Sequence, residues 1–397
     1  MKRLLGWVLA FAALIAVGVL GWWLMHASTA QENDSMAVRA LKTKGDERPL
    51  DDEPFAPFAD RDGGLVRRDD AGAFNLSDDD EVFVDAGADL LEFRRMLAKN
   101  AEQATRNVDK FCELSRRVSK MSPAPAAQGS HDAALYLSSR IDWEGGVLGS
   151  LHLPKSLTDR MSAPPDAWWR MEAADYAGLD FGWLTELLGY DTWALSTTGP
   201  LRDLERTNFL EAPIPNFVSL MHWAKLRFLK GALEADLARA SMEVRHLAML
   251  CGSTHLLIGD MIRFAIYGIE RRFFEQLGQP APSGLSDAVD GESSRRTVFA
   301  GMYFLYPGVP KAVRQKALTC AASRCSAMTE AIAINAAARA TLPEAQEGLE
   351  WLLGQHPCDA ELAARIAKSP PASDEVLAHQ IDDVPSLDDL LTFDAGR

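Results

Sequence analysis

The sequence lacks the motifs that would identify an enzyme. It contains no GxGxxG or GxxxxGKS/T loop for nucleotide phosphates, and no GxSxG, SxxK or HExxH arrangement for hydrolysis. Basic residues are also scarce, because 41 Lys and Arg stand against 56 Asp and Glu, a formal net charge of −15. Such a balance argues against general nucleic-acid binding, which requires a basic face. We therefore expect no cofactor and no nucleic-acid partner.

Cysteine is rare as well, and none of the five cysteines belongs to a CxxC pair. This spacing argues against a zinc site or a thioredoxin-type redox pair, and the odd number leaves at least one thiol without an intramolecular partner. Cys320 and Cys325 share one helical stretch, and Cys358 follows after a helix and a turn. We predict a disulfide between Cys358 and either Cys320 or Cys325. The alternative is a set of buried free thiols, which pack as small apolar groups.

Long uncharged apolar runs are absent except at the N-terminus. Residues 4–25 carry no charge, and as a helix rising about 1.5 Å per residue they would extend roughly 33 Å, enough to cross a bilayer. The basic residues Lys2 and Arg3 precede this run, and the first acidic residues follow it. We predict a single transmembrane helix at 4–25 in the plasma (inner) membrane, with residues 1–3 cytoplasmic and the body periplasmic or extracellular. The alternative is a cleaved signal peptide ending near Ser28-Thr29-Ala30.

The acidic residues gather in two flanking segments. Residues 31–90 have a net charge of −10, and residues 369–397 have a net charge of −6. Blocks of like charge with few apolar residues usually remain solvated. We predict an acidic, disordered and flexible tether over 26–86 and an acidic tail over 369–397, on either side of a nearly neutral folded region.

The folded region shows helical spacing of apolar residues. A seven-residue repeat of apolar residues predicts a helix over 89–121; the repeat consists of Leu90, Leu97, Ala104, Phe111 and Val118. This helix either packs on the protein's own core or forms a dimeric coiled coil. Apolar residues at intervals of three and four predict further helices near 217–229, 233–250 and 257–269. Short connections between helices of this length are typical of antiparallel hairpins.

These patterns predict an all-α fold built of helical hairpins, as a bundle or a solenoid-like stack. We divide it into a helical body at 87–278, a Gly/Pro/Ser-rich linker at 279–292 and a C-terminal helical subdomain at 293–368. The body would contain the long helix, an irregular tryptophan-rich region and the hairpins.

The irregular region concentrates five of the ten tryptophans: Trp143, Trp168, Trp169, Trp183 and Trp193. Clustered aromatic rings can line a ligand-binding groove, and they also fill the core between short helices, because an indole ring buries a large area. The sequence leaves both interpretations open.

One pair of residues has the spacing of a metal ligand set. Glu243 and His246 form an ExxH on a predicted helix, as in carboxylate-bridged di-iron bundles, but such sites require a second pair and two further glutamates. No second ExxH exists, so we predict a polar contact between helices and no metal site.

The acidic tail contains one amphipathic segment, SLDDLLTFD. Leu387, Leu390 and Leu391 share one helical face, and Phe393 follows. We single out these four residues as a candidate partner motif, because an apolar helical face can lie in a partner's groove. The alternatives are docking on the protein's own body and lack of fixed structure.

Together these features predict a membrane-anchored, exported helical scaffold or protein-interaction component of the cell envelope, with the membrane and one or more proteins as partners. Enzymatic activity is not indicated. The alternatives are a carboxylate-dependent envelope hydrolase and a ligand-binding module lined by the tryptophans.

Overall fold

We describe the protein from a computed structural model of the chain. The described residues are 86–121, 131–141, 148–149, 151, 153–162, 171–280, 291–378 and 386–391. The predicted transmembrane helix at 4–25 and the predicted tether before Ala86 lie outside them. Among the described helices, none has the length and apolar character needed to cross a bilayer.

The described residues confirm the all-α prediction. The long helices are α3 (Ala86–Met121), α9 (Phe217–Leu233), α10 (Leu237–Ser253), α11 (Leu257–Gln276), α12 (Gly291–Tyr303), α13 (Lys311–Cys320), α14 (Arg324–Ala338) and α15 (Pro343–Leu353). Shorter helices are α4 (Ala134–Ser138), α5 (Lys155–Ser162), α7 (Ala173–Tyr176), α8 (Gly182–Leu187), α16 (Ala360–Lys368), α17 (Asp374–Ala378) and α18 (Leu387–Leu391). Two residue pairs, β1 (Leu148–Gly149) and β2 (Ile214–Pro215), form a small parallel ladder.

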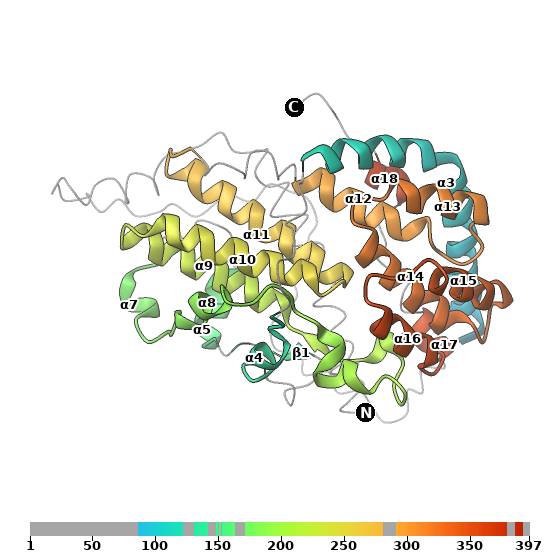
Figure 1. Cartoon of the computed structure of the whole chain (residues 1–397), viewed down its shortest axis with the longest axis horizontal. Helices are drawn as coiled ribbons and strands as arrows, with labels where there is room; N and C mark the ends of the chain where they lie inside the picture. Colours follow the sequence, from blue (N-terminus) through green and yellow to red (C-terminus); the bar gives the residue numbers. More distant parts are fainter. Residues whose placement is uncertain are drawn as a thin grey trace, which may run out of the picture.

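Helices α9, α10 and α11 pack side by side and form the centre of one half of the molecule (Figure 1). They correspond to the three helices predicted from apolar spacing. Helix α9 is buried on nearly every side, because α5 and α7 cover it in addition to its two long neighbours, and Trp183 of α8 packs against its Trp223. The Asn216 side chain begins α9 by accepting a hydrogen bond from the Val218 N–H at 3.2 Å, which satisfies one of the free donors of the first turn.

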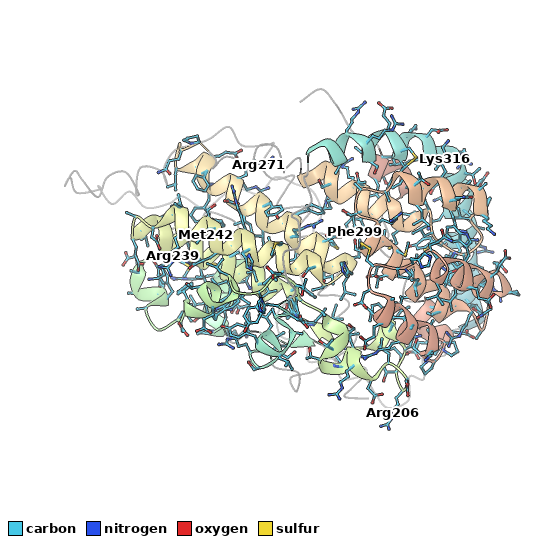
Figure 2. All side chains as sticks on the ribbon, viewed as in Figure 1. Arg206, Arg239, Met242, Arg271, Phe299 and Lys316 are labelled. Atoms are coloured by element: carbon cyan, nitrogen blue, oxygen red, sulfur yellow. A yellow bond between two sulfur atoms is a disulfide. The ribbon has the colours of Figure 1, made fainter. Side chains whose placement is uncertain are left out.

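Helix α3 runs along the outer edge of the other half and packs against α12, α13, α17 and α18 (Figure 1). The predicted seam is the buried face of this helix, with Leu97, Ala104, Phe111 and Val118 all in the interior. The seam therefore packs on the protein's own core, and the coiled-coil interpretation is not needed to explain it. Lys316 of α13, labelled in Figure 2, reaches Asp109 of α3 at 2.5 Å.

Two disulfides tie the second half together. Cys112 of α3 pairs with Cys320 at the end of α13, with Cα atoms 5.0 Å apart and 208 residues between them. Cys325 of α14 pairs with Cys358 ahead of α16, with Cα atoms 5.5 Å apart. The second bridge is one of the two pairings that the sequence left open. The first was not foreseen, because Cys112 is far from the others along the chain.

Part of the acidic tail folds onto the body. Leu387 and Leu390 of α18 are buried against α3 and α12, while Asn107 of α3 donates a hydrogen bond to Asp388 at 2.6 Å. The leucines singled out as a partner motif thus belong to the protein's own core, and Phe393 lies outside the described residues. The apolar face of α3 covers them, which the sequence of the tail alone does not show.

The helices on the two sides of the predicted linker share their packing. Residues 281–290 lie outside the described residues, but α11 packs directly against α12 and α14. One buried apolar cluster includes side chains from α9, α10, α11, α14, α15 and α16. In the described residues, the segments at 87–278 and 293–368 therefore pack through a common core.

Two glycines in α11 provide a matched test of this packing. A Cβ atom at Gly259 would lie 2.3 Å from the Cys251 carbonyl oxygen of α10, whereas one at Gly268 would have no neighbour within 4 Å. We predict that Gly259→Ala destabilises the fold by about 1–3 kcal/mol, because the backbone of α10 must move. Gly268→Ala should stabilise it by about 0.5–1 kcal/mol, because alanine is the better helix former. Urea unfolding followed by circular dichroism measures both; equal effects would contradict the close approach of α10 and α11.

Candidate functional site

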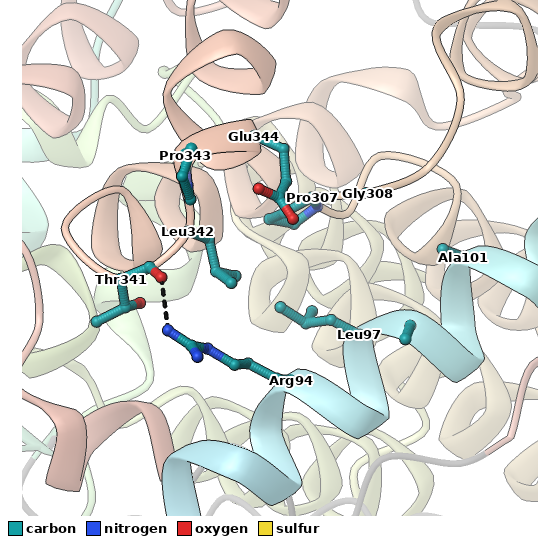
Figure 3. A pocket seen from close by; sticks show the side chains of 10 residues that line it. Arg94, Leu97, Ala101, Pro307, Gly308, Thr341, Leu342, Pro343 and Glu344 are labelled. Atoms are coloured by element: carbon teal, nitrogen blue, oxygen red, sulfur yellow. Dashed lines mark hydrogen bonds between the residues drawn. The ribbon is translucent and has the colours of Figure 1, made fainter.

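An open groove of about 590 Å³ lies between the first half of α3 and the start of α15 (Figure 3). Three segments line it: one side of α3, the turn after α12 and the turn that leads into α15. Their lining residues are Arg94, Leu97, Ala98 and Ala101, then Pro307 and Gly308, then Thr341, Leu342, Pro343 and Glu344. The groove thus combines residues that lie almost 250 positions apart in the sequence.

The floor of the groove is apolar and its rim is charged. Leu97 and Leu342 approach each other from opposite walls, while the Arg94 guanidinium donates a hydrogen bond to the Thr341 carbonyl oxygen at 2.9 Å (Figure 3). Glu344 lies on the other rim. Arg94 and Glu344 are the ionisable side chains among the lining residues, and the hydroxyl of Thr341 donates a hydrogen bond to the Ala338 carbonyl oxygen at 3.0 Å. This arrangement suits binding of an extended segment with apolar side chains, and it provides no general base beside a nucleophile.

The ExxH pair has the role that the sequence analysis predicted, a polar contact between helices. Glu243 accepts hydrogen bonds from Arg227 at 2.6 Å and from Arg239 at 3.0 Å, and Thr185 donates a further one. His246 lies 2.7 Å from the Tyr190 carbonyl oxygen. Both side chains are therefore occupied by protein groups. In the part of the chain that the structure describes, no three His, Cys, Asp or Glu side chains are placed to hold a metal ion.

The two candidate tryptophans that the structure describes are core residues. Trp183 packs edge-on against Trp223, with ring centres 5.4 Å apart, and Trp193 packs against Phe217 at 5.5 Å. Both indole rings are buried. Trp143, Trp168 and Trp169 lie outside the described residues. Trp183 and Trp193 thus support the core interpretation of the aromatic cluster.

One serine–histidine contact resembles a catalytic pair but has the wrong electrostatics. Ser162 Oγ lies 3.4 Å from His222 Nε2, across 60 residues of sequence. Burial, with the nearby Lys225 ammonium, lowers the pKa of His222 to about 3, so its imidazole binds a proton only weakly. His222 Nδ1 has no orienting partner among the described residues. A general base needs a pKa near the working pH and a fixed orientation, so this pair does not form a hydrolytic dyad.

Two carboxyl groups, the buried Asp260 and the partly buried Glu330, meet the start of α11. Asp260, in its first turn, contacts Arg263 at 2.6 Å and accepts a hydrogen bond from Ser326 of α14. Glu330, one turn further along α14, accepts a hydrogen bond from the Leu257 N–H. Negative charge at a helix N-terminus is favourable, which offsets part of the cost of burying the two carboxyl groups. Burial nevertheless raises the pKa of Asp260 and raises that of Glu330 to about 7.

No family model, curated protein or solved structure matches the chain. The description of the site therefore depends on its own geometry. No sequence motif marks Arg94, Leu342 or Glu344 as site residues, because only the fold brings them together.

The carboxyl of Glu330 predicts a pH dependence of stability. Its pKa is about 7 in the folded protein and about 4.3 when unfolded, so its contribution is fully present below about pH 4.3 and is lost as the pH rises through 7. Glu330→Gln keeps a hydrogen-bond acceptor but cannot ionise. We predict that the variant gains about 1–3 kcal/mol in unfolding free energy relative to the native protein between about pH 4.5 and 7.5, since one pKa unit corresponds to about 1.4 kcal/mol.

Urea unfolding at a series of pH values measures this difference. Glu344→Gln, at an exposed position, serves as the control and should follow the native curve within about 0.5 kcal/mol. A constant difference between Glu330→Gln and the native protein over the whole range would show that Glu330 ionises normally.

Proposed function

We propose that the protein is a membrane-anchored, exported helical scaffold or protein-interaction component of the cell envelope, with its N-terminus in the cytoplasm and its body outside. The observation that carries this proposal is the pair of disulfides. One bridge joins α3 to α13 and the other joins α14 to the segment ahead of α16, and disulfides persist in oxidising compartments such as the periplasm and the cell surface. Their presence favours export of the folded body.

The anchor itself is proposed from the sequence. The uncharged run at 4–25 is long enough to cross a bilayer, and the basic residues ahead of it favour a cytoplasmic N-terminus. A body on the outer side would then be held near the membrane by the acidic segment that follows. An exported body tethered in this way is well placed to present a binding surface to other envelope proteins.

The geometry favours interaction over catalysis. The groove between α3 and α15 has an apolar floor and no paired acid and base, and the buried Arg227, Glu243 and Asp260 each contact protein partners. Exposed apolar side chains are also present outside the groove. Met242, labelled on α10 in Figure 2, is 53% exposed and Leu135 of α4 is 79% exposed. Exposed large apolar residues of this kind are enriched where proteins associate, although single ones are common on any surface.

The test is purification of the intact chain from its own membranes. An affinity tag can be inserted at Gly278, which lies in an exposed turn. A Cβ atom at this position would have no neighbour within 4 Å. We expect the full chain to be recovered from the membrane fraction with a stoichiometric protein partner. The matched control is residues 1–85 fused to an unrelated folded domain, which keeps the same proposed anchor and tether.

A partner that is absent from the control depends on the helical body and supports the proposal. Recovery of the full chain with only those proteins that also accompany the control would contradict a scaffold or interaction role. Recovery of the protein solely from the soluble exported fraction, with its N-terminus near Ala30, would contradict the anchor and support a cleaved signal peptide.

A further inference from the structure

We propose that the exposed side of α3 and α13 binds the anionic headgroups of a phospholipid bilayer. The first observation is a local excess of positive charge. Residues 106–121 and 311–325 together contain nine basic and two acidic residues, a net charge of +7 in a chain whose total is −15. Seven of these basic side chains are exposed and form what we call the basic surface: Arg106, Lys110, Arg116, Arg117, Lys311, Lys316 and Arg324.

The fold joins the two segments into one surface. Helix α3 runs along the outer edge of the molecule and packs against α13 (Figure 1). The Cys112–Cys320 disulfide and the ion pair of Lys316 with Asp109 at 2.5 Å hold the two helices side by side. The exposed sides of α3 and α13 are therefore neighbours, although they lie about two hundred residues apart in the sequence.

The basic residues of α3 share its exposed side. Arg106, Lys110 and Arg117 are four and seven residues apart, a spacing that places side chains above one another on a helix. Arg116 lies one turn beyond Cys112, on the side of α3 that faces α13. The positive charge of α3 thus continues toward that of α13.

The acidic residues of this surface do not cancel its charge. Three exposed acidic residues of α3 each form an ion pair with a basic one: Glu102 with Arg106 at 3.0 Å, Asp109 with Lys316, and Glu113 with Arg117. The members of the basic surface that form no ion pair with a described residue are Lys110, Arg116, Lys311 and Arg324. Four positive charges therefore remain uncompensated on the two neighbouring helices.

Acidic groups of the adjacent helices lie at the borders of the basic surface. Asp388 of α18 accepts a hydrogen bond from Asn107, a buried residue of α3, at 2.6 Å. Glu347 of α15 interacts with Arg314, a buried residue of α13. Both carboxylates thus contact groups behind the exposed side of α3 and α13.

The distribution of the charges favours a lipid surface over a single anion. The basic side chains are spread along two helices and do not converge on one point, which suits an array of many headgroups. Each basic residue that reaches an anionic bilayer strengthens binding about fivefold. Screening limits this attraction to charges within about 10 Å, so the face that meets the bilayer matters more than the net charge of the chain. The inference rests on the proposed function in one respect, because the anchor at 4–25 would keep the body beside a bilayer.

Energy transfer in the reconstituted full-length chain tests this proposal. The vesicles consist of phosphatidylcholine alone or with about one-third phosphatidylglycerol, and both kinds contain a headgroup-labelled acceptor lipid. A fluorescent amino acid replaces Thr319, which is exposed on α13, and in a matched variant it replaces Met242 of α10, in the other half of the molecule (Figure 2). We expect phosphatidylglycerol to raise the transfer from position 319 at least twofold and from position 242 much less, and about 1 M salt to remove the rise.

Removal of charge provides a second readout. Lys110→Gln combined with Arg116→Gln should weaken the attachment to anionic vesicles about ten- to thirtyfold, because two basic contacts are lost. Lys155→Gln combined with Lys368→Gln makes the same change in net charge at exposed positions outside the basic surface, and it should change the attachment less than about twofold. Equal losses in the two double variants would show that only the net charge matters and would overturn the proposal.

Flotation of the same samples separates the basic surface from the anchor. Flotation with both kinds of vesicle, but with equal transfer from position 319 in the two lipids, would overturn the basic surface and leave the proposed function intact. Flotation with anionic vesicles only, lost in the Lys110→Gln, Arg116→Gln variant, would support the basic surface and contradict the anchor. Capture of labelled poly-glutamate without any response to anionic lipid would overturn the proposal in favour of an acidic protein partner.

Discussion

The attachment of α3 to the C-terminal helices is the constraint on which the second half of the structure depends. This helix buries a continuous apolar face against α12, α13, α17 and α18, and the Cys112–Cys320 bridge fixes its C-terminal third. The bridge closes a loop of 208 residues, and by chain-entropy arguments such a loop contributes roughly 5 kcal/mol. Without α3, the apolar faces of α12, α17 and α18 would be exposed. The position of α3 also forms one wall of the groove, so the same constraint creates the candidate site.

The other half depends on buried ion pairs as well as on apolar packing. Arg227 and Glu243 are both nearly inaccessible to water and join α9 to α10, and Glu270 of α11 pairs with Arg245 of α10 at 2.9 Å. Loss of one partner of such a pair typically costs about 3–5 kcal/mol, because the remaining charge is buried without compensation. These pairs therefore specify how the three helices align. The ionisable side chains of these ion pairs therefore serve the packing of helices, and their presence does not by itself indicate an active site.

Local patterns predicted the helices well, but not the contacts between them. The spacing of apolar residues identified α9, α10 and α11, and the seven-residue repeat identified α3, because both depend on the geometry of a single helix. The Cys112–Cys320 bridge, the contact of Arg94 with Thr341 and the burial of Leu387 depend on segments that are distant in sequence. The amphipathic character of the tail is visible in its own sequence, but the apolar face of α3 that covers its leucines is not. For Trp183 and Trp193, aromatic composition alone did not distinguish a core from a groove.

The Cys112–Cys320 disulfide binds α3 to the body, and the export that we propose requires this fold to form in an oxidising compartment. Peptide mapping of the native protein, isolated from its own cells with free thiols blocked at lysis and without reductant, tests both together. We expect one linked peptide pair containing Cys112 and Cys320, a second containing Cys325 and Cys358, and Cys251 as a thiol that is alkylated only after unfolding. Five free thiols would contradict export, and a Cys320–Cys358 link would contradict the arrangement of α3 on the C-terminal helices.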